Sequence, residues 1–165
     1  MANVQDVARF FIDLAVHQNS ANRGDLMTNL RLQKLLYFAQ GWHLARYGRR
    51  LFDAEIEAWN YGPVVPEVYH AYKDNGRFGI AEVTGFTENA FTPEEYDLLL
   101  DVAREYARYS TGTLVDLSHA PNAPWSHTAQ SAVIPTNEIH AYFAGKEEPL
   151  RSFDDILDEY PVEEL

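Results

Sequence analysis

The chain has 165 residues, and its 25 Asp and Glu outnumber its 13 Lys and Arg, giving a formal net charge of −12. Apolar residues make up 46% of it, enough to offset the entropy cost of folding, which excludes a wholly disordered chain. The absence of cysteine excludes a disulfide framework, a thiolate metal site and a cysteine nucleophile. The length predicts one domain.

The first two predicted helices follow from apolar residues at three- and four-residue spacing. Residues 3–18 carry one apolar stripe, which predicts an amphipathic helix. A second helix begins near Thr28 and ends at Gly48, and apolar residues on two of its faces predict that it is buried at the centre of the fold. His43 on this helix is interpreted as a core histidine or a partner contact.

Two short strands and a rigid turn are predicted next. Residues 51–59 alternate between apolar and polar side chains after Asp53, which favours a strand, and residues 78–86 favour a second, weaker one. Between them, the sequence YGPVVP at residues 61–66 contains one glycine and two prolines, which excludes a helix through this segment and predicts a rigid turn. Pro66 suits the first turn of a third helix, predicted over 66–74.

The second half of the chain is predicted to be helical. Thr92, Pro93 and Glu95 form a helix start, with Thr92 as N-cap and Glu95 completing a capping box, and the helix runs to about Ser110. Further helical segments are predicted at residues 112–119, at 137–144 with Thr136 as cap, and at 153–157. The predicted fold class is mainly α, a compact single-domain helical bundle with a small antiparallel β hairpin.

The negative charge is concentrated at the C-terminal end. Residues 146–165 hold two basic and eight acidic residues, a net charge of −6. Because nucleic-acid affinity comes from Lys and Arg neutralising phosphates, the overall charge makes nucleic-acid binding an unfavoured function. It is compatible with a basic protein partner, or simply with a well-solvated surface.

The side chains that carry enzyme chemistry show no catalytic pattern. The six histidines lack metal-ligand spacing, and Asp116, His119 and His127 are linked only by proximity in sequence. Glu55 and Glu57 would lie on one face of a strand, which fits paired carboxylates or a solvated face. No phosphate-binding glycine loop and no nucleophile elbow is present. We therefore predict no enzyme activity, no cofactor and no metal.

The cellular location is predicted from the N-terminus and the hydropathy. The first residues include an acidic side chain where a signal peptide carries Lys or Arg. No apolar run approaches the roughly 18 residues of a membrane span. The sequence therefore predicts a cytoplasmic protein without a membrane partner.

Large aromatic residues occur in or beside the turn-rich segments. Trp and Tyr are the residue types that most often anchor protein interfaces, although each of them also packs well in a core. The residues in question are Trp42, Trp59, Tyr61, Tyr69, Tyr72 and Trp125. At least one of them is expected at an interface.

Several segments resemble one known family. These are LQKLLYFAQGW at residues 32–42, LFD at 51–53, EAWNYGPVVPEVY at 57–69, LSH at 117–119 and Pro124-Trp125. Together they resemble the signature of the Panacea-domain antitoxins, also called SocA-like or GepA-like and often described as phage-associated proteins. Ser118 stands where the family commonly has Thr. The resemblance covers roughly residues 3–145, so we predict a Panacea domain over 1–145 and an acidic tail over 146–165.

The resemblance implies an antitoxin that is encoded beside a toxin gene in bacteria or prophages and neutralises the toxin by binding it. In the SocA-like branch it implies an alternative, an adaptor that delivers its toxin to a Clp protease. A third hypothesis, based on the residues alone, is that the protein is a hydrolase that uses His119 with Glu57 or Asp116. The predicted partners are thus a cognate toxin and, for the adaptor, a Clp protease.

Two sets of site residues follow from these segments. Partner contact is predicted for the aromatic and apolar side chains Trp42, Trp59, Tyr61, Val65 and Tyr69. A structural role is predicted for the other motif residues, Tyr37, Gly62, Pro63, Pro66, His119 and Trp125.

Overall fold

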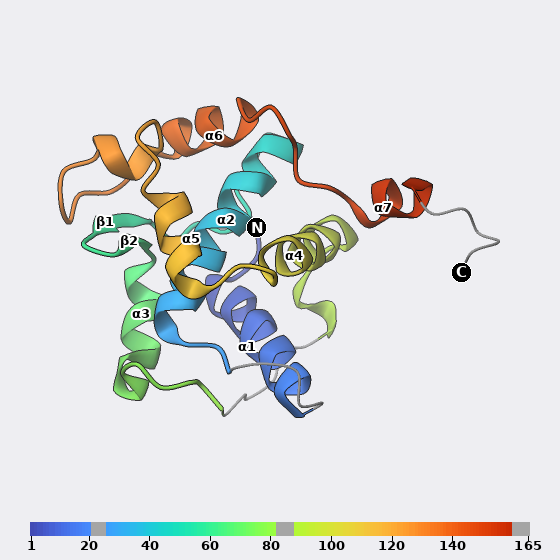
Figure 1. The fold of residues 1–165 in the computed structure, drawn as a ribbon, viewed down its shortest axis with the longest axis horizontal. Coiled ribbons are helices and arrows are strands. Elements are labelled where there is room, and N and C mark those ends of the chain that lie inside the picture. The colour runs from blue at the N-terminus through green and yellow to red at the C-terminus, as the bar shows by residue number, and fades with distance from the viewer. Residues whose placement is uncertain (21–25, 82–87, 160–165) are drawn as a thin grey trace.

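A computed structural model describes residues 1–20, 26–81 and 88–159. Over these residues the chain is mainly α with one small two-stranded antiparallel sheet, which confirms the predicted fold class (Figure 1). The middle of the fold is helix α2, Asn29–Tyr47, and 14 of its 19 residues are buried. Other helices pack around α2: α1 (Val4–Ser20), α4 (Pro93–Tyr106), α5 (Thr111–Ser118) and α6 (Thr136–Ala144).

Helix α2 begins and ends where the sequence predicts. The Thr28 hydroxyl accepts a hydrogen bond from the Arg31 N–H at 3.2 Å, which satisfies a free donor of the first turn. Gly48 adopts a left-handed conformation with φ of 73° and donates its N–H to the Leu44 carbonyl. The flanking helices cover α2 on several sides, and this explains the apolar residues on two of its faces.

The hairpin lies in a different place from the predicted strands. Strands β1, Glu57–Trp59, and β2, Gly62–Val64, pair in antiparallel register, with Trp59 opposite Gly62. Only the last three residues of the predicted strand 51–59 are therefore a strand, and part of the predicted turn at 61–66 is the second strand. At the start of β2, Gly62 has a φ of 114°, which residues other than glycine rarely adopt.

The third helix is shorter than predicted. Helix α3 spans Pro66–Tyr72, with Pro66 at its first position, and a 3₁₀ turn, Lys73–Asn75, follows it. The strand predicted at 78–86 is wrong for its first residues, where Ile80 makes a single bridge to Met27. Residues 82–87 lie outside the described part.

The capping box of α4 is present, with Glu95 donating its N–H to Thr92 and Thr92 donating its N–H to the Glu95 carboxylate. The helix ends at Tyr106 rather than near Ser110 because Ser110 instead caps α5, accepting the Thr113 N–H at 3.1 Å. Pro135, not Thr136, is the cap of α6. Short 3₁₀ turns lie at Glu88–Ala90 and Pro124–His127.

The last helix, α7 (Phe153–Glu159), projects away from the body of the molecule (Figure 1). The chain reaches it through Leu150, which is buried against the core. The final turn predicted at 153–157 is therefore a helix of two turns. It is the one element in this view that stands apart from the bundle.

Candidate partner-binding surface

The hairpin is held from inside by a buried lysine of α2. Lys34 has no exposed surface, and its Nζ donates to the Pro63 carbonyl at 2.8 Å. Burial lowers the pKa of Lys34 to about 7. A Cβ on Gly62 would lie 2.7 Å from the Ser118 Oγ and 2.9 Å from the Lys34 Cε. The hairpin backbone therefore rests directly on side chains of α2 and α5.

A second network of buried hydrogen bonds connects α2 to the start of α3. The Gln33 Oε1 accepts the Val65 N–H at 2.9 Å, and the Gln33 Nε2 donates to the Asn29 Oδ1 at 2.8 Å. The Asn29 Nδ2 in turn donates to the Tyr69 carbonyl at 3.0 Å. Because hydrogen bonds in a low dielectric are directional and costly to break, these contacts fix the orientation of α3 on α2.

The other face of the hairpin is held by the segment after α5. The Trp125 Nε1 donates to the Trp59 carbonyl at 2.7 Å. The His119 ring stacks on the Trp125 ring with a centroid distance of 3.7 Å and an interplanar angle of 11°. Burial, followed by the nearby Lys34 charge, lowers the pKa of His119. His119 and Trp125 thus brace the backbone of the hairpin.

Three further motif residues have packing roles. Tyr37 is buried, meets the Phe143 ring edge-on at 5.3 Å, and its pKa is raised by burial. Pro63 is buried in β2, and Pro66 supplies the fixed φ at the start of α3. None of the three presents a large exposed side chain.

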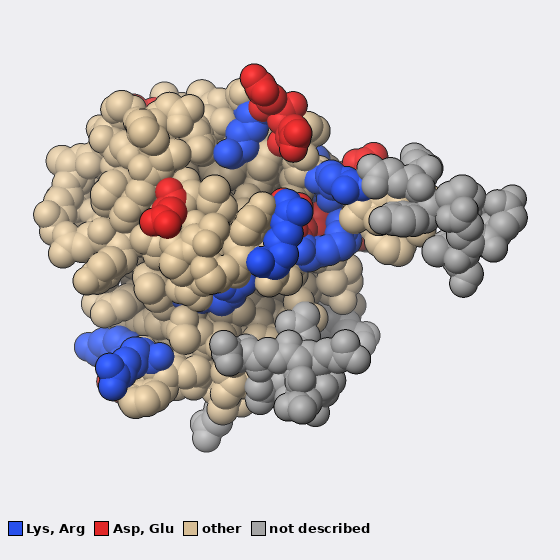
Figure 2. All heavy atoms as spheres, in the orientation of Figure 1, with Lys and Arg blue, Asp and Glu red and all other residues tan. Residues whose placement is uncertain are grey.

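Three aromatic side chains emerge from this support, and we call Trp59, Tyr61 and Tyr69 the hairpin surface. Tyr61, next to the hairpin turn, is 69% exposed. Trp59 and Tyr69 are half-buried and pack edge-to-face at 4.9 Å. Most of the face over the hairpin in Figure 2 carries neither Lys or Arg nor Asp or Glu.

An acidic hollow adjoins the hairpin surface. It has a volume of about 450 Å³ and is lined by the carboxylates Asp53, Glu55, Glu57 and Glu67. The Glu57 Oε1 accepts a hydrogen bond from the Trp59 Nε1 at 3.0 Å, which joins the hollow to the aromatic side chains. The two carboxylates considered for catalysis, Glu55 and Glu57, therefore lie beside an aromatic surface.

Two residues predicted to contact a partner lie in the interior instead. Trp42 is 6% exposed, and its Nε1 donates to the Tyr106 hydroxyl at 2.8 Å. Val65 has no exposed surface. The sequence could not separate them from the exposed aromatics, because large apolar residues serve both cores and interfaces. Both belong to the packing of the domain and not to the hairpin surface.

The buried polar residues Asn29, Gln33 and Lys34 were missed as site residues in the sequence. The sequence feature that could have identified them is the presence of polar side chains on a helix that is otherwise apolar around most of its circumference. Such groups are buried only when hydrogen-bonded, so each of them marks a backbone segment packed on α2.

The described part of the chain has neither a metal-binding cluster nor a membrane-spanning helix. No group of three His, Asp or Glu side chains there is arranged to hold a metal ion. No helix in that part is long and apolar enough to cross a membrane. The ring of His119, proposed in the hydrolase reading, stacks on Trp125, while Asp116 is exposed.

The fold and its surface define a mainly α domain in which a buried helix supports an exposed aromatic hairpin. The sequence model of the family described as "Antitoxin SocA-like, Panacea domain" matches residues 32–126, which contain most of the supporting helix and the whole hairpin. The chain belongs to this SocA-like Panacea-domain family.

One curated relative is Antitoxin SocA of Caulobacter vibrioides (strain NA1000 / CB15N), which is 37% identical over 109 residues. The alignment covers 60% of this chain and 58% of the relative, so the match spans little more than half the length of that protein. No solved structure matches the chain.

Proposed function

We propose that the protein is an antitoxin that neutralises a cognate toxin by binding it directly through the hairpin surface. Membership of an antitoxin family supports the class of function. The observation that supports the binding mode is the exposure of Tyr61 near Trp59 and Tyr69, on a hairpin that hydrogen bonds from Lys34 and Trp125 hold in place. Aromatic anchors on a rigid support bind well because little conformational freedom is lost on association.

The charge of the protein supports a toxin with a basic surface. The net charge of −12 and the acidic hollow beside Trp59 produce a negative field around the proposed contact. Such a field speeds the encounter with a basic partner, and salt screens it. We expect the association rate constant to fall as NaCl is raised, whereas the dissociation rate constant changes little.

The first test is co-expression with the product of each adjacent gene, scoring growth and following the abundance of that product on a blot. Rescue of growth with an intact, co-purifying neighbour is the expected result. If growth is rescued but the neighbour disappears in a protease-dependent way, the protein is an adaptor for proteolysis and not an inhibitor that acts by binding. If neither neighbour is toxic, the antitoxin proposal fails.

The second test asks whether the hairpin surface makes the contact. Tyr61→Ser is expected to raise the Kd for the toxin about tenfold or more, because it removes a central aromatic anchor. Phe78→Ser is the matched control, since Phe78 is also 69% exposed but lies outside the hairpin surface. Equal Kd values for the two variants, with both chains folded by circular dichroism, would place the toxin elsewhere.

A further inference from the structure

Helix α7 displays an apolar face to solvent. Phe153 is 57% exposed and Leu157 is 39% exposed, with Ile156 half-buried between them. At about 100° per residue, positions 153, 156 and 157 fall on one side of a helix, within an arc of about 100°. Asp154 and Asp155 are exposed outside this arc. The helix is therefore amphipathic although it projects from the body.

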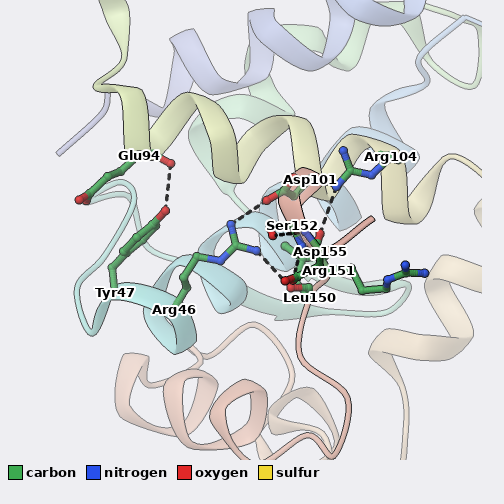
Figure 3. A network of polar contacts seen from close by, with 9 residues as sticks. All are labelled: Arg46, Tyr47, Glu94, Asp101, Arg104, Leu150, Arg151, Ser152 and Asp155. Carbon is green, nitrogen blue, oxygen red and sulfur yellow. Dashed lines mark hydrogen bonds and ion pairs between the residues drawn. The ribbon is translucent and has the colours of Figure 1, made fainter. Parts of the chain in front are cut away.

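The base of α7 is fixed on the bundle by a clamp of charged groups (Figure 3). The buried carboxylate of Asp101 binds Arg46 at 2.7 Å and Arg104 at 2.7 Å. Arg46 also donates to the Leu150 carbonyl at 3.2 Å, and Arg104 donates to the Arg151 carbonyl at 3.1 Å. One carboxylate thus orients two arginines that hold the chain just before α7.

The start of α7 is also fixed. The Ser152 Oγ accepts the Asp155 N–H at 3.1 Å, and the Asp155 carboxylate accepts the Ser152 N–H at 3.1 Å. This reciprocal pair, seen in Figure 3, satisfies donors that the first turn leaves open. Hydrogen bonds from Ser152 lower the pKa of Asp155. The helix is thus started and aimed by specific contacts, while its apolar face stays open.

A cleft of about 820 Å³ lies between the base of α7 and the outer side of α4. Its apolar lining includes Leu14, Leu100, Ala103, Ala107 and Phe153, and the Tyr47 side chain also lines it. Leu100 is 36% exposed, so the lining is accessible. The apolar face of α7 therefore begins at the edge of an apolar cleft and continues its surface.

The charged residues that line the cleft, Arg46 and Arg104 against Asp97, Asp101 and Asp154, have a net charge of −1. Its two arginines, Arg46 and Arg104, share the carboxylate of Asp101. Asp97 and Asp154 also line the cleft and form no ion pair with any residue in the described part of the chain.

We infer that the cleft between α4 and α7 binds an amphipathic segment of the toxin that is rich in Lys and Arg. The apolar side of that segment packs on Leu100 and Phe153, and its cations pair with Asp97 and Asp154. A second copy of this chain fits poorly, because it carries the same net charge of −12. The inference rests on the proposed function and adds a second contact, separate from the hairpin surface.

Two linked contacts strengthen binding beyond either one alone, because the second forms within an existing complex. The test uses the purified full-length chain and the purified toxin identified by co-expression. The double variant Phe153→Ser/Leu157→Ser is expected to raise the Kd about 10- to 100-fold, mainly through faster dissociation. Leu30→Ser is the matched control, since Leu30 is 38% exposed and lies at the start of α2; its Kd is expected to stay at the wild-type value.

The charge of the proposed partner is tested separately. Asp97→Lys/Asp154→Lys is expected to slow association at low salt, and the difference from wild type should shrink as NaCl is raised. An association rate equal to wild type at low salt would overturn the basic character of the partner segment.

The two proposals fail in different ways. If wild type binds the toxin and the Phe153→Ser/Leu157→Ser variant binds equally well, the cleft is not a contact, while the hairpin proposal stands. If wild type forms no complex with the toxin, both proposals fall. Sedimentation of the free chain supplies one further outcome, because a wild-type dimer that Phe153→Ser/Leu157→Ser converts to monomer would show that a second copy covers the cleft.

Discussion

The hairpin and helix α7 both expose aromatic side chains on short elements, but the body holds them differently. The hairpin and the start of α3 receive buried hydrogen bonds from Lys34 and Gln33 and a part-buried one from Trp125. Among the residues that the structure describes, α7 is held at its base, by the clamp around Asp101 and by the Arg104 guanidinium over the Phe153 ring. We therefore expect the hairpin to unfold with the whole domain and α7 to open locally at a lower free energy.

The residues that support the hairpin differ from the residues that are exposed to a partner. Most residues of the family motif, such as Lys34, Pro63 and Val65, point into the interior and hold the backbone of the hairpin. The side chains available to a partner, Tyr61 and Phe153, stand beside the supports or outside the matched segment 32–126. Such a motif maintains the fold of the domain. The exposed positions can therefore differ between members of the family and bind different partners.

The largest expected effect is on the support of the hairpin. Gly62→Ala is expected to lower the free energy of unfolding by about 3 kcal/mol or more, because it combines an unfavourable positive φ with a Cβ pushed against Ser118 and Lys34. Gly48→Ala is the control, since Gly48 also has a positive φ but its Cβ would meet nothing within 4 Å, and about 1 kcal/mol is expected. Urea unfolding measures both, and equal losses would contradict close packing beneath the hairpin.

The next effect concerns pH and Lys34. Its pKa is about 7 in the folded state against an ordinary value of 10.5, so at higher pH the folded protein is neutral there while the unfolded chain still binds the proton. Stability should therefore rise with pH above 7, by about 2 kcal/mol between pH 7 and about pH 9, whereas below pH 7 the folded state carries the full cost of the buried cation. Lys34→Met is expected to remove most of this rise in urea unfolding. A rise of the same size in the variant would assign it to other groups.

The sequence predicted the elements whose signals are local. The caps at Thr28, Gly48 and Thr92 are where the pattern placed them, since capping depends on side chains within a few residues. The hairpin was misplaced because Gly62 and Pro63 are typical turn residues, and the hydrogen bonds that hold the hairpin, such as those from Lys34 and Trp125, come from residues distant in sequence. Burial of Trp42 and Val65 is likewise a tertiary property.

A smaller loss is expected at the clamp of α7. Asp101→Asn leaves the geometry of the side chain but removes the charge that pairs with Arg46 and Arg104. Because Asp101 is buried and the arginines are partly exposed, about 2 kcal/mol of unfolding free energy should be lost. Asp6→Asn, which breaks a partly exposed pair with Arg9, is the control, with an expected loss below about 0.5 kcal/mol. Similar losses for both would show that the clamp contributes no more than a surface ion pair.

The smallest expected effects on unfolding free energy come from removing two serine caps that make the same kind of hydrogen bond. Ser110→Ala removes the cap of α5, which packs on α2, and should lower the global free energy of unfolding by about 1 kcal/mol. Ser152→Ala removes the equivalent bond in α7, and because the described contacts of α7 lie at its base, the global change should stay below about 0.3 kcal/mol. The loss should appear instead as faster amide hydrogen exchange at Ile156, whose N–H donates to the Ser152 carbonyl. A global loss as large as that of Ser110→Ala would mean that α7 unfolds together with the bundle, and the cleft beside it would then be as rigid as the support of the hairpin.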